Sequence, residues 1–128
     1  MSLHKAFNTL TLEFIEKLII TLPKEKNFKL LKTGVSLMAR INYRKPVELF
    51  KLYVDKYRTY IINRDNDYFL KENFEYIIEE NKNIIKSEVN AFNLIDRLKN
   101  YWDDFSENNR NVVWEYLNQM LKITDAIT

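Results

Sequence analysis

The side chains that most often carry catalysis or bind metal ions are sparse in this sequence. His4 is the only histidine and cysteine is absent, so a catalytic triad, thiol catalysis and a Cys-based zinc site lack the residues they need. A lone histidine in a terminal segment is typical of an exposed residue without a chemical role. The sequence therefore predicts no metal and no cofactor, and it favours a protein that is not an enzyme.

Acidic residues form three short groups whose residue types could bind calcium or act in acid–base catalysis. Asp65-Asn66-Asp67 offers oxygen atoms at alternate positions, but a calcium loop starting there would need glycine at Leu70 and glutamate at Tyr76. A polar turn that ends a helix explains this group better. The pairs Glu79-Glu80 and Asp103-Asp104 hold adjacent acids, which point in different directions on a helix and favour solvated charges over catalytic carboxylates.

Charge is distributed unevenly along the chain. Residues 24–64 contain eleven Lys/Arg and three acids, a net charge of +8, whereas residues 65–128 contain seven and thirteen, a net charge of −6. Three interpretations stay open: a phosphate-binding face, the two ends of a head-to-tail contact, or a solvated surface encoded by an AT-rich genome. The candidate basic face for a partner or a nucleic acid consists of Lys24, Lys26, Lys29, Lys32, Arg40, Arg44 and Lys45.

Tyrosines gather in and around residues 43–68. In a helical bundle most of them should lie in the core or at its edge. Tyr53 and Tyr60 are expected on the outer side, where a tyrosine is a natural anchor for a protein partner.

Glycine and proline are too rare for a fold that depends on tight turns. The 128 residues include one glycine and two prolines, which argues against an all-β protein and excludes Gly-rich phosphate-binding loops. The longest apolar run is Leu18-Ile19-Ile20, far below the ~20 residues that span a bilayer, and no signal peptide is recognised. We expect a soluble, all-α, single-domain bundle of about five to six helices over residues 1–128, without a membrane partner.

Hydrophobic periodicity predicts where these helices lie. One helix should cover about residues 2–22 and a second about 24–41, with Leu30, Leu37 and Ile41 broadening the apolar face of the second. Gly34 lies inside that second pattern and predicts either a close helix crossing or a break.

A third helix should run from Pro46 to about Ile61, where apolar residues follow a clean 3-4-3-4 spacing. A short fourth helix is expected around residues 74–78, a fifth from about 89 to 104, and a last one from an N-cap at Ser106 to about Ile123, followed by a frayed tail. The predicted core comprises Phe14, Leu18, Leu31, Phe50, Val54, Ile61, Leu98, Trp102, Val113 and Leu117.

Several local motifs are spread along the chain: Phe7-Asn8-Thr9-Leu10, Asn42-Tyr43-Arg44-Lys45-Pro46, Tyr68-Phe69-Leu70, Ser106-Glu107-Asn108-Asn109 and Val113-Trp114. In these motifs the chain resembles small, uncharacterised helical proteins of large nucleocytoplasmic DNA viruses of algae and protists. The resemblance spans most of the chain and implies a viral origin, but it assigns no chemistry to any residue.

Together these features favour a non-catalytic interaction or structural protein. Within a virus it would be a virion component or a small adaptor subunit of a viral complex, located in the host cytoplasm or in the virion. The alternative is a nucleic-acid-binding accessory factor that uses the basic face of residues 24–64. Binding of a protein partner or self-association is expected in the first case, and binding to nucleic acid in the second.

Overall fold

The computed structural model of the chain describes residues 2–54, 58–65 and 101–127, except the side chains of Asn27, Tyr53 and Asp103. All regular elements in these ranges are helical, which confirms the all-α class. They are α1 (Leu3–Thr21), α2 (Asn27–Ile41), α3 (Lys45–Val54), α4 (Arg58–Ile62), the 3₁₀ turn η2 (Trp102–Asp104) and α8 (Glu107–Ala126). The predicted helix around residues 74–78, most of the predicted helix 89–104, Leu98 and Asp67 lie outside the described residues.

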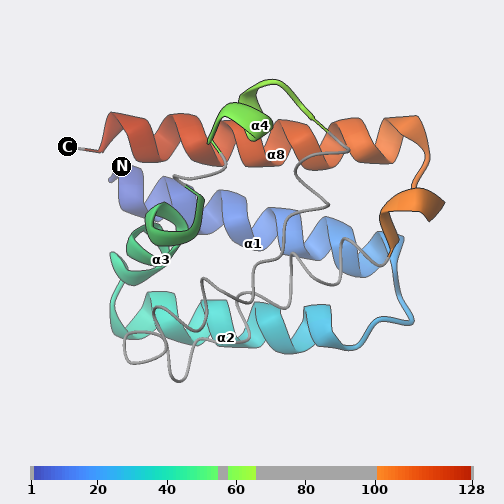
Figure 1. Cartoon of the computed structure of the whole chain (residues 1–128). Coiled ribbons are helices and arrows are strands. Elements are labelled where there is room, and N and C mark those ends of the chain that lie inside the picture. Colours follow the sequence, from blue (N-terminus) through green and yellow to red (C-terminus); the bar gives the residue numbers. More distant parts are fainter. Residues whose placement is uncertain (1, 55–57, 66–100, 128) are drawn as a thin grey trace.

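Three long helices form a layer with α1 in the middle (Figure 1). The α8 helix packs along one side of α1 and α2 along the other, and α1 runs antiparallel to both. The short helix α3 crosses one end of the layer against α1 and α2, while α4 lies over α8. Among the three long helices α2 is therefore an edge helix, with α1 on one side of it.

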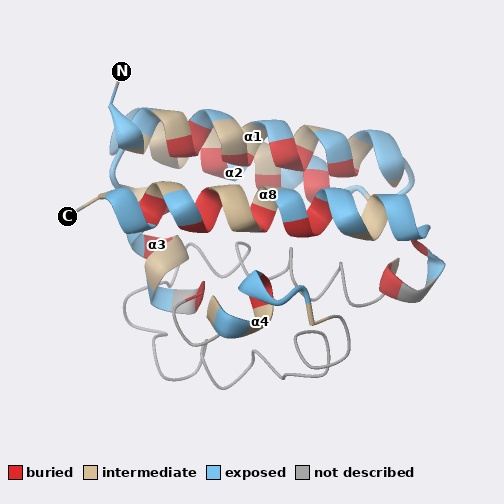
Figure 2. Ribbon diagram, turned by 90° about the horizontal axis from the view of Figure 1, so that it is seen from above, coloured by how far each residue is buried: buried red, intermediate tan, exposed pale blue. Residues whose placement is uncertain are grey.

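The core lies mainly between α1 and α8, where the buried faces of the two helices meet (Figure 2). Phe14 stacks on Tyr116 with ring centroids 5.0 Å apart, and Trp102 meets Trp114 edge-on at 5.6 Å. Each fully buried large apolar side chain contributes about 1.5 to 3 kcal/mol. The predicted core residues Phe14, Leu18, Leu31, Val54, Ile61, Trp102, Val113 and Leu117 are buried, and Phe50 is half-buried against this core.

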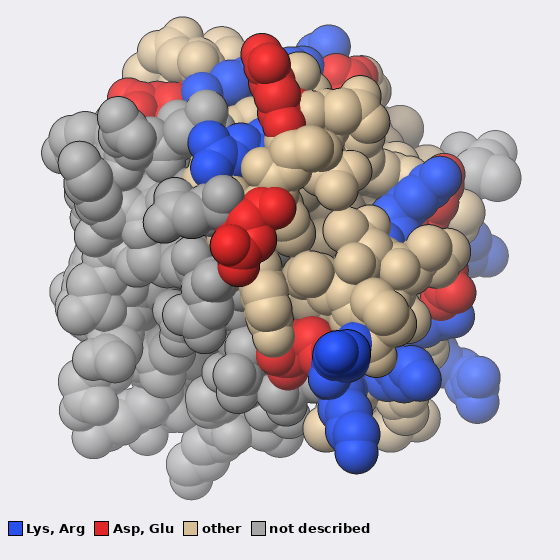
Figure 3. Space-filling model, turned by 90° about the vertical axis from the view of Figure 1, so that its right-hand side faces the viewer, with Lys and Arg blue, Asp and Glu red and all other residues tan. Residues whose placement is uncertain are grey.

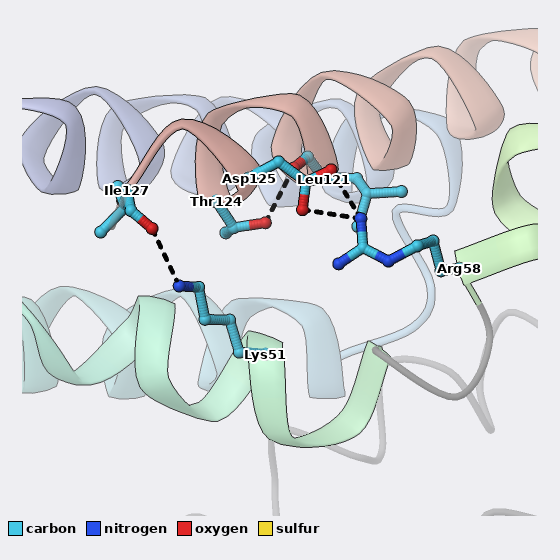
Figure 4. Close-up of polar contacts among 6 residues, drawn as sticks. All are labelled: Lys51, Arg58, Leu121, Thr124, Asp125 and Ile127. Atoms are coloured by element: carbon cyan, nitrogen blue, oxygen red, sulfur yellow. Dashed lines mark hydrogen bonds and ion pairs between the residues drawn. The ribbon is translucent and has the colours of Figure 1, made fainter.

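The last helix starts as predicted and ends later. Ser106 is its N-cap, and the Ser106 hydroxyl accepts a hydrogen bond from the backbone N–H of Asn109 at 3.1 Å. The expectation that the chain frays after Ile123 is wrong, because α8 continues to Ala126 and Thr124 is only 2% exposed. The Lys51 ammonium on α3 also donates to the carbonyl of Ile127 at 3.2 Å (Figure 4), which ties the end of α8 to the bundle.

The second helix also differs from its prediction. It begins at Asn27 rather than near Lys24, because Pro23 and the next residues form a turn after α1. Gly34 lies within uninterrupted helix, so no break occurs there. None of the described helices crosses closely there either, because a Cβ added at Gly34 would meet none of their atoms within 4 Å.

Candidate partner-binding surface

The predicted basic residues do not form one continuous face. Lys24 lies in the turn before α2, Lys26 caps the start of α2, and Lys29 follows one turn later, all exposed. Arg40 is exposed in the last turn of α2, about 20 Å from Lys26 at 1.5 Å per residue. These four cations make no ion pair with the described residues. Figure 3, which views the end of the molecule where α2 begins, shows basic side chains gathered at the α2 side of that face.

Two other members of the predicted basic face are paired with acids. The ammonium of Lys32 lies 2.6 Å from a carboxylate oxygen of Glu16 on α1, and both side chains are roughly half-exposed. Lys45 lies 3.9 Å from Glu48 one turn along α3. Partly exposed pairs of this kind add at most ~1 kcal/mol to stability. They do reduce the positive charge that Lys32 and Lys45 present to a partner.

The remaining member, Arg44, belongs to a small cluster around Tyr43 at the other end of α2. The Arg44 guanidinium lies 5.5 Å and the Lys5 ammonium 5.9 Å from the centroid of the Tyr43 ring. His4 meets the same ring edge-on at 5.9 Å. Asn8 fixes this turn by donating from its side-chain amide to the Tyr43 carbonyl at 2.9 Å. His4 thus has a packing role, and the cluster adds two cations beside Arg40.

Part of the charge difference between the two halves of the chain is neutralised inside the molecule. Arg58 donates to both carboxylate oxygens of Asp125 at 2.5 and 2.6 Å (Figure 4), and Arg64 contacts Glu115 at 2.8 Å. Hydrogen bonds from Gln119 and then from Arg64 lower the pKa of the Glu115 carboxyl. These contacts join α4 and the turn after it to α8, so the acids Asp125 and Glu115 already have cationic partners within one chain.

An exposed apolar stripe on α2 was not predicted. Leu30, Leu37 and Ile41 were expected to widen the core face, but they are 65%, 53% and 78% exposed, so this prediction is wrong. At 3.6 residues per turn their directions lie within about 40° of one another, and Gly34 falls beside them. Lys32, which reaches α1, points to nearly the opposite side of the helix. The stripe formed by Leu30, Gly34, Leu37 and Ile41 therefore lies on the flank of α2 that is turned away from Lys32 and its α1 partner.

Three exposed cations at the two ends of α2, called the basic ridge below, lie to one side of this apolar stripe, with about 16 Å of helix between Lys29 and Arg40. The directions of Lys26, Lys29 and Arg40 fall within about 60° of one another, and the ridge lies about 80° from the stripe around the helix axis. Because the core face formed by Phe28, Leu31, Val35 and Met38 takes a third direction, α2 presents the stripe between its core face and its basic ridge.

Of the two predicted tyrosine anchors, only Tyr60 can be compared with this surface. Tyr60 on α4 is half-buried and packs against the main core, so it does not stand on the outer side as expected. The side chain of Tyr53 on α3 lies outside the described residues.

A metal site and a membrane-spanning helix are both absent from the described residues. No group of three or more His, Asp or Glu side chains among them is arranged to hold a metal ion. None of the helices in the described ranges combines the length and the apolar character needed to cross a membrane. Comparison of the chain with protein-family models, with curated proteins and with solved structures finds no significant match.

Proposed function

We propose that this chain is a non-catalytic interaction protein that binds a protein partner through the exposed face of α2. The observation that carries the proposal is the apolar stripe Leu30, Gly34, Leu37 and Ile41, which lies in the open on an edge helix. Scattered single apolar residues are normal on a protein surface, but an aligned stripe is typical of an interaction site.

The stripe is large enough to contribute to binding. Fully burying a leucine or isoleucine contributes about 1.5 to 3 kcal/mol, so covering Leu30, Leu37 and Ile41 in their partly exposed state would yield about 3 to 6 kcal/mol. Losses of motional freedom on association offset much of this gain. The adjacent Lys26, Lys29 and Arg40 would supply charge attraction and faster encounter with an acidic partner.

Site-directed cross-linking tests this proposal in the cells that express the protein. Leu37 is replaced by the photoreactive residue p-benzoylphenylalanine, and Ile62 on α4 is replaced in a matched control, because Ile62 is 56% exposed and lies outside the stripe. We expect a discrete adduct from position 37 that disappears when Leu30 is changed to Glu, and no such adduct from position 62. Equal labelling from both positions would rule the proposal out.

We also propose that the protein is viral and acts as a virion component or as a small adaptor subunit in the host cytoplasm. The support is the sequence resemblance described above, together with an amino-acid composition typical of an AT-rich genome. Mass spectrometry of purified particles and of the cytoplasmic fraction of infected cells distinguishes the two locations. Absence of the protein from both would contradict this part of the proposal.

A nucleic-acid-binding accessory factor is a second candidate, favoured by the exposed cations Lys24, Lys26, Lys29, Arg40 and Arg44. If all five contacted phosphates, the logarithm of duplex affinity would fall with the logarithm of salt concentration with a slope of about −4.5. The test is duplex binding by the double variant Lys29→Glu/Arg40→Glu at several salt concentrations. Lys32 is left unchanged, because glutamate there would face Glu16 and weaken the fold. Duplex binding that survives this reversal would exclude the basic face.

A further inference from the structure

The spacing of the exposed residues on α2 suggests what binds to the apolar stripe. In paired helices, a side chain of one helix inserts into a hole formed by residues i, i+3, i+4 and i+7 of the other. Leu30, Thr33, Gly34 and Leu37 have this spacing and all four are exposed. Because Gly34 lacks a Cβ and no neighbouring atom of the described chain lies within 4 Å of that position, one corner of the hole is open.

Gly34 lowers the stability of α2, and no contact among the described residues explains why a glycine stands there. Glycine in a helix interior is markedly less stable than alanine, and this is the only glycine of the chain. No close approach by α1 or α3 requires it, since no neighbouring atom of the described residues lies within 4 Å of a Cβ built there. A large side chain entering from outside would use that space.

The positive charges near the hole favour a partner that carries negative charges. Lys26, Lys29 and Arg40 flank the stripe on one side and make no ion pair with the described residues. Two copies of this chain that paired through α2 would bring these cations together, which disfavours self-association. A helix with Asp or Glu beside its apolar face would complement both parts of the surface. A nucleic acid would match the cations and leave the apolar stripe exposed.

We propose that α2 binds an acidic amphipathic helix of a protein partner, which inserts a large apolar side chain into the hole over Gly34. The inference rests on the proposed function and names the partner of the same surface. The stripe from Leu30 to Ile41 spans about 16 Å, so three helical turns of the partner suffice.

The probe is a fluorescent three-heptad peptide with leucine at a and d and glutamate at e and g. Its like charges suppress pairing with itself. Two companion peptides carry lysine at e and g, or alanine in place of the central leucines. Binding to the full chain is followed by fluorescence anisotropy at low and moderate salt.

We expect saturable binding of the glutamate peptide, about ten-fold weaker binding of the alanine peptide, and no measurable binding of the lysine peptide. Gly34→Met should reduce affinity for the glutamate peptide about ten-fold by filling the hole. Methionine is a good helix former, so the unfolding midpoint of this variant should not fall. The double variant Lys29→Glu/Arg40→Glu should reverse the preference between the two charged peptides.

Several results would overturn the inference. They are an unchanged affinity in Gly34→Met, equal binding of both charged peptides, no binding of the glutamate peptide, or a dimer in light scattering that Leu37→Glu abolishes. Binding of duplex DNA instead of the peptide would assign this surface to nucleic-acid binding, the second candidate function. If the peptides fail while the Leu37 cross-link persists, the proposed function stands and only its acidic-helix form is wrong.

Discussion

Replacing Gly34 with alanine should stabilise the protein, whereas the same change destabilises a protein where the glycine has a positive φ angle. Gly34 lies in the interior of α2 with an ordinary helical backbone and without a positive φ angle. A Cβ there meets no neighbouring atom within the described chain. The substitution therefore removes the entropic cost of ordering glycine without introducing a clash.

The expected gain follows from helix propensity. Alanine is favoured over glycine by about 0.5 to 1 kcal/mol in an exposed helix interior. At about 2.1 cal/mol/K of unfolding entropy per residue, a domain of this size would gain roughly 2 to 4 °C in Tm. The slope of the urea unfolding free energy should stay unchanged, because the exposed surface does not change.

Urea and thermal unfolding of a short series tests this reasoning. Gly34→Ala, Gly34→Met and Gly34→Val should rank by helix propensity, with alanine and methionine above valine and all three at or above glycine. A lower midpoint for Gly34→Ala would refute the view that the site is open. A loss of stability that grows with side-chain size would show that another part of the molecule occupies the space.

Substitutions at three further positions, with controls, test the packing, the helix cap and the pH dependence. Leu117→Ala should cost about 2 to 5 kcal/mol in urea unfolding because Leu117 is buried, whereas the same change at the exposed Leu37 should stay within about 0.5 kcal/mol. Ser106→Ala should cost about 1 kcal/mol by removing the N-cap of α8, and Ser106→Asp should retain most of that stability. Burial, and then the hydrogen bond to Glu13, raise the pKa of the Tyr116 phenol above 10.0. The stability that Tyr116 provides is therefore present below that pH and is lost as the pH rises through the folded-state value. Tyr116→Phe should flatten the decline measured by urea unfolding above about pH 9.

The sequence predicted the helical class and part of the described core because those features depend on local periodicity. Phe7, Phe14 and Leu18 repeat at the spacing of one helical face, and they are buried. Ser106 was recognisable as an N-cap because its hydroxyl acts within one turn. Trp114 was not among the predicted core residues and is in fact 1% exposed, because contact with Trp102 depends on a chain reversal that periodicity does not report.

Charge pairing was less predictable, since it depends on contacts between distant segments. Lys32 and Glu16 are sixteen residues apart, and Arg58 and Asp125 are sixty-seven apart. A count of charge along the chain treats these residues as free. The fold neutralises some of them, Lys32 of α2 included, and leaves Lys29 and Arg40 exposed, so the effective basic surface is smaller than the predicted one.

The stripe on α2 did leave a signal in the sequence. Its apolar residues and those of the core face together cover about half of the helix circumference, whereas a helix that packs on one side needs little more than ~100°. Periodicity shows that this arc is wide, but it does not show whether the same chain covers it. The structure leaves Leu30, Leu37 and Ile41 exposed beside Lys29 and Arg40. Since phosphates would satisfy only the charges and an apolar surface only the stripe, a partner that offers both acidic and apolar groups accounts for the whole face.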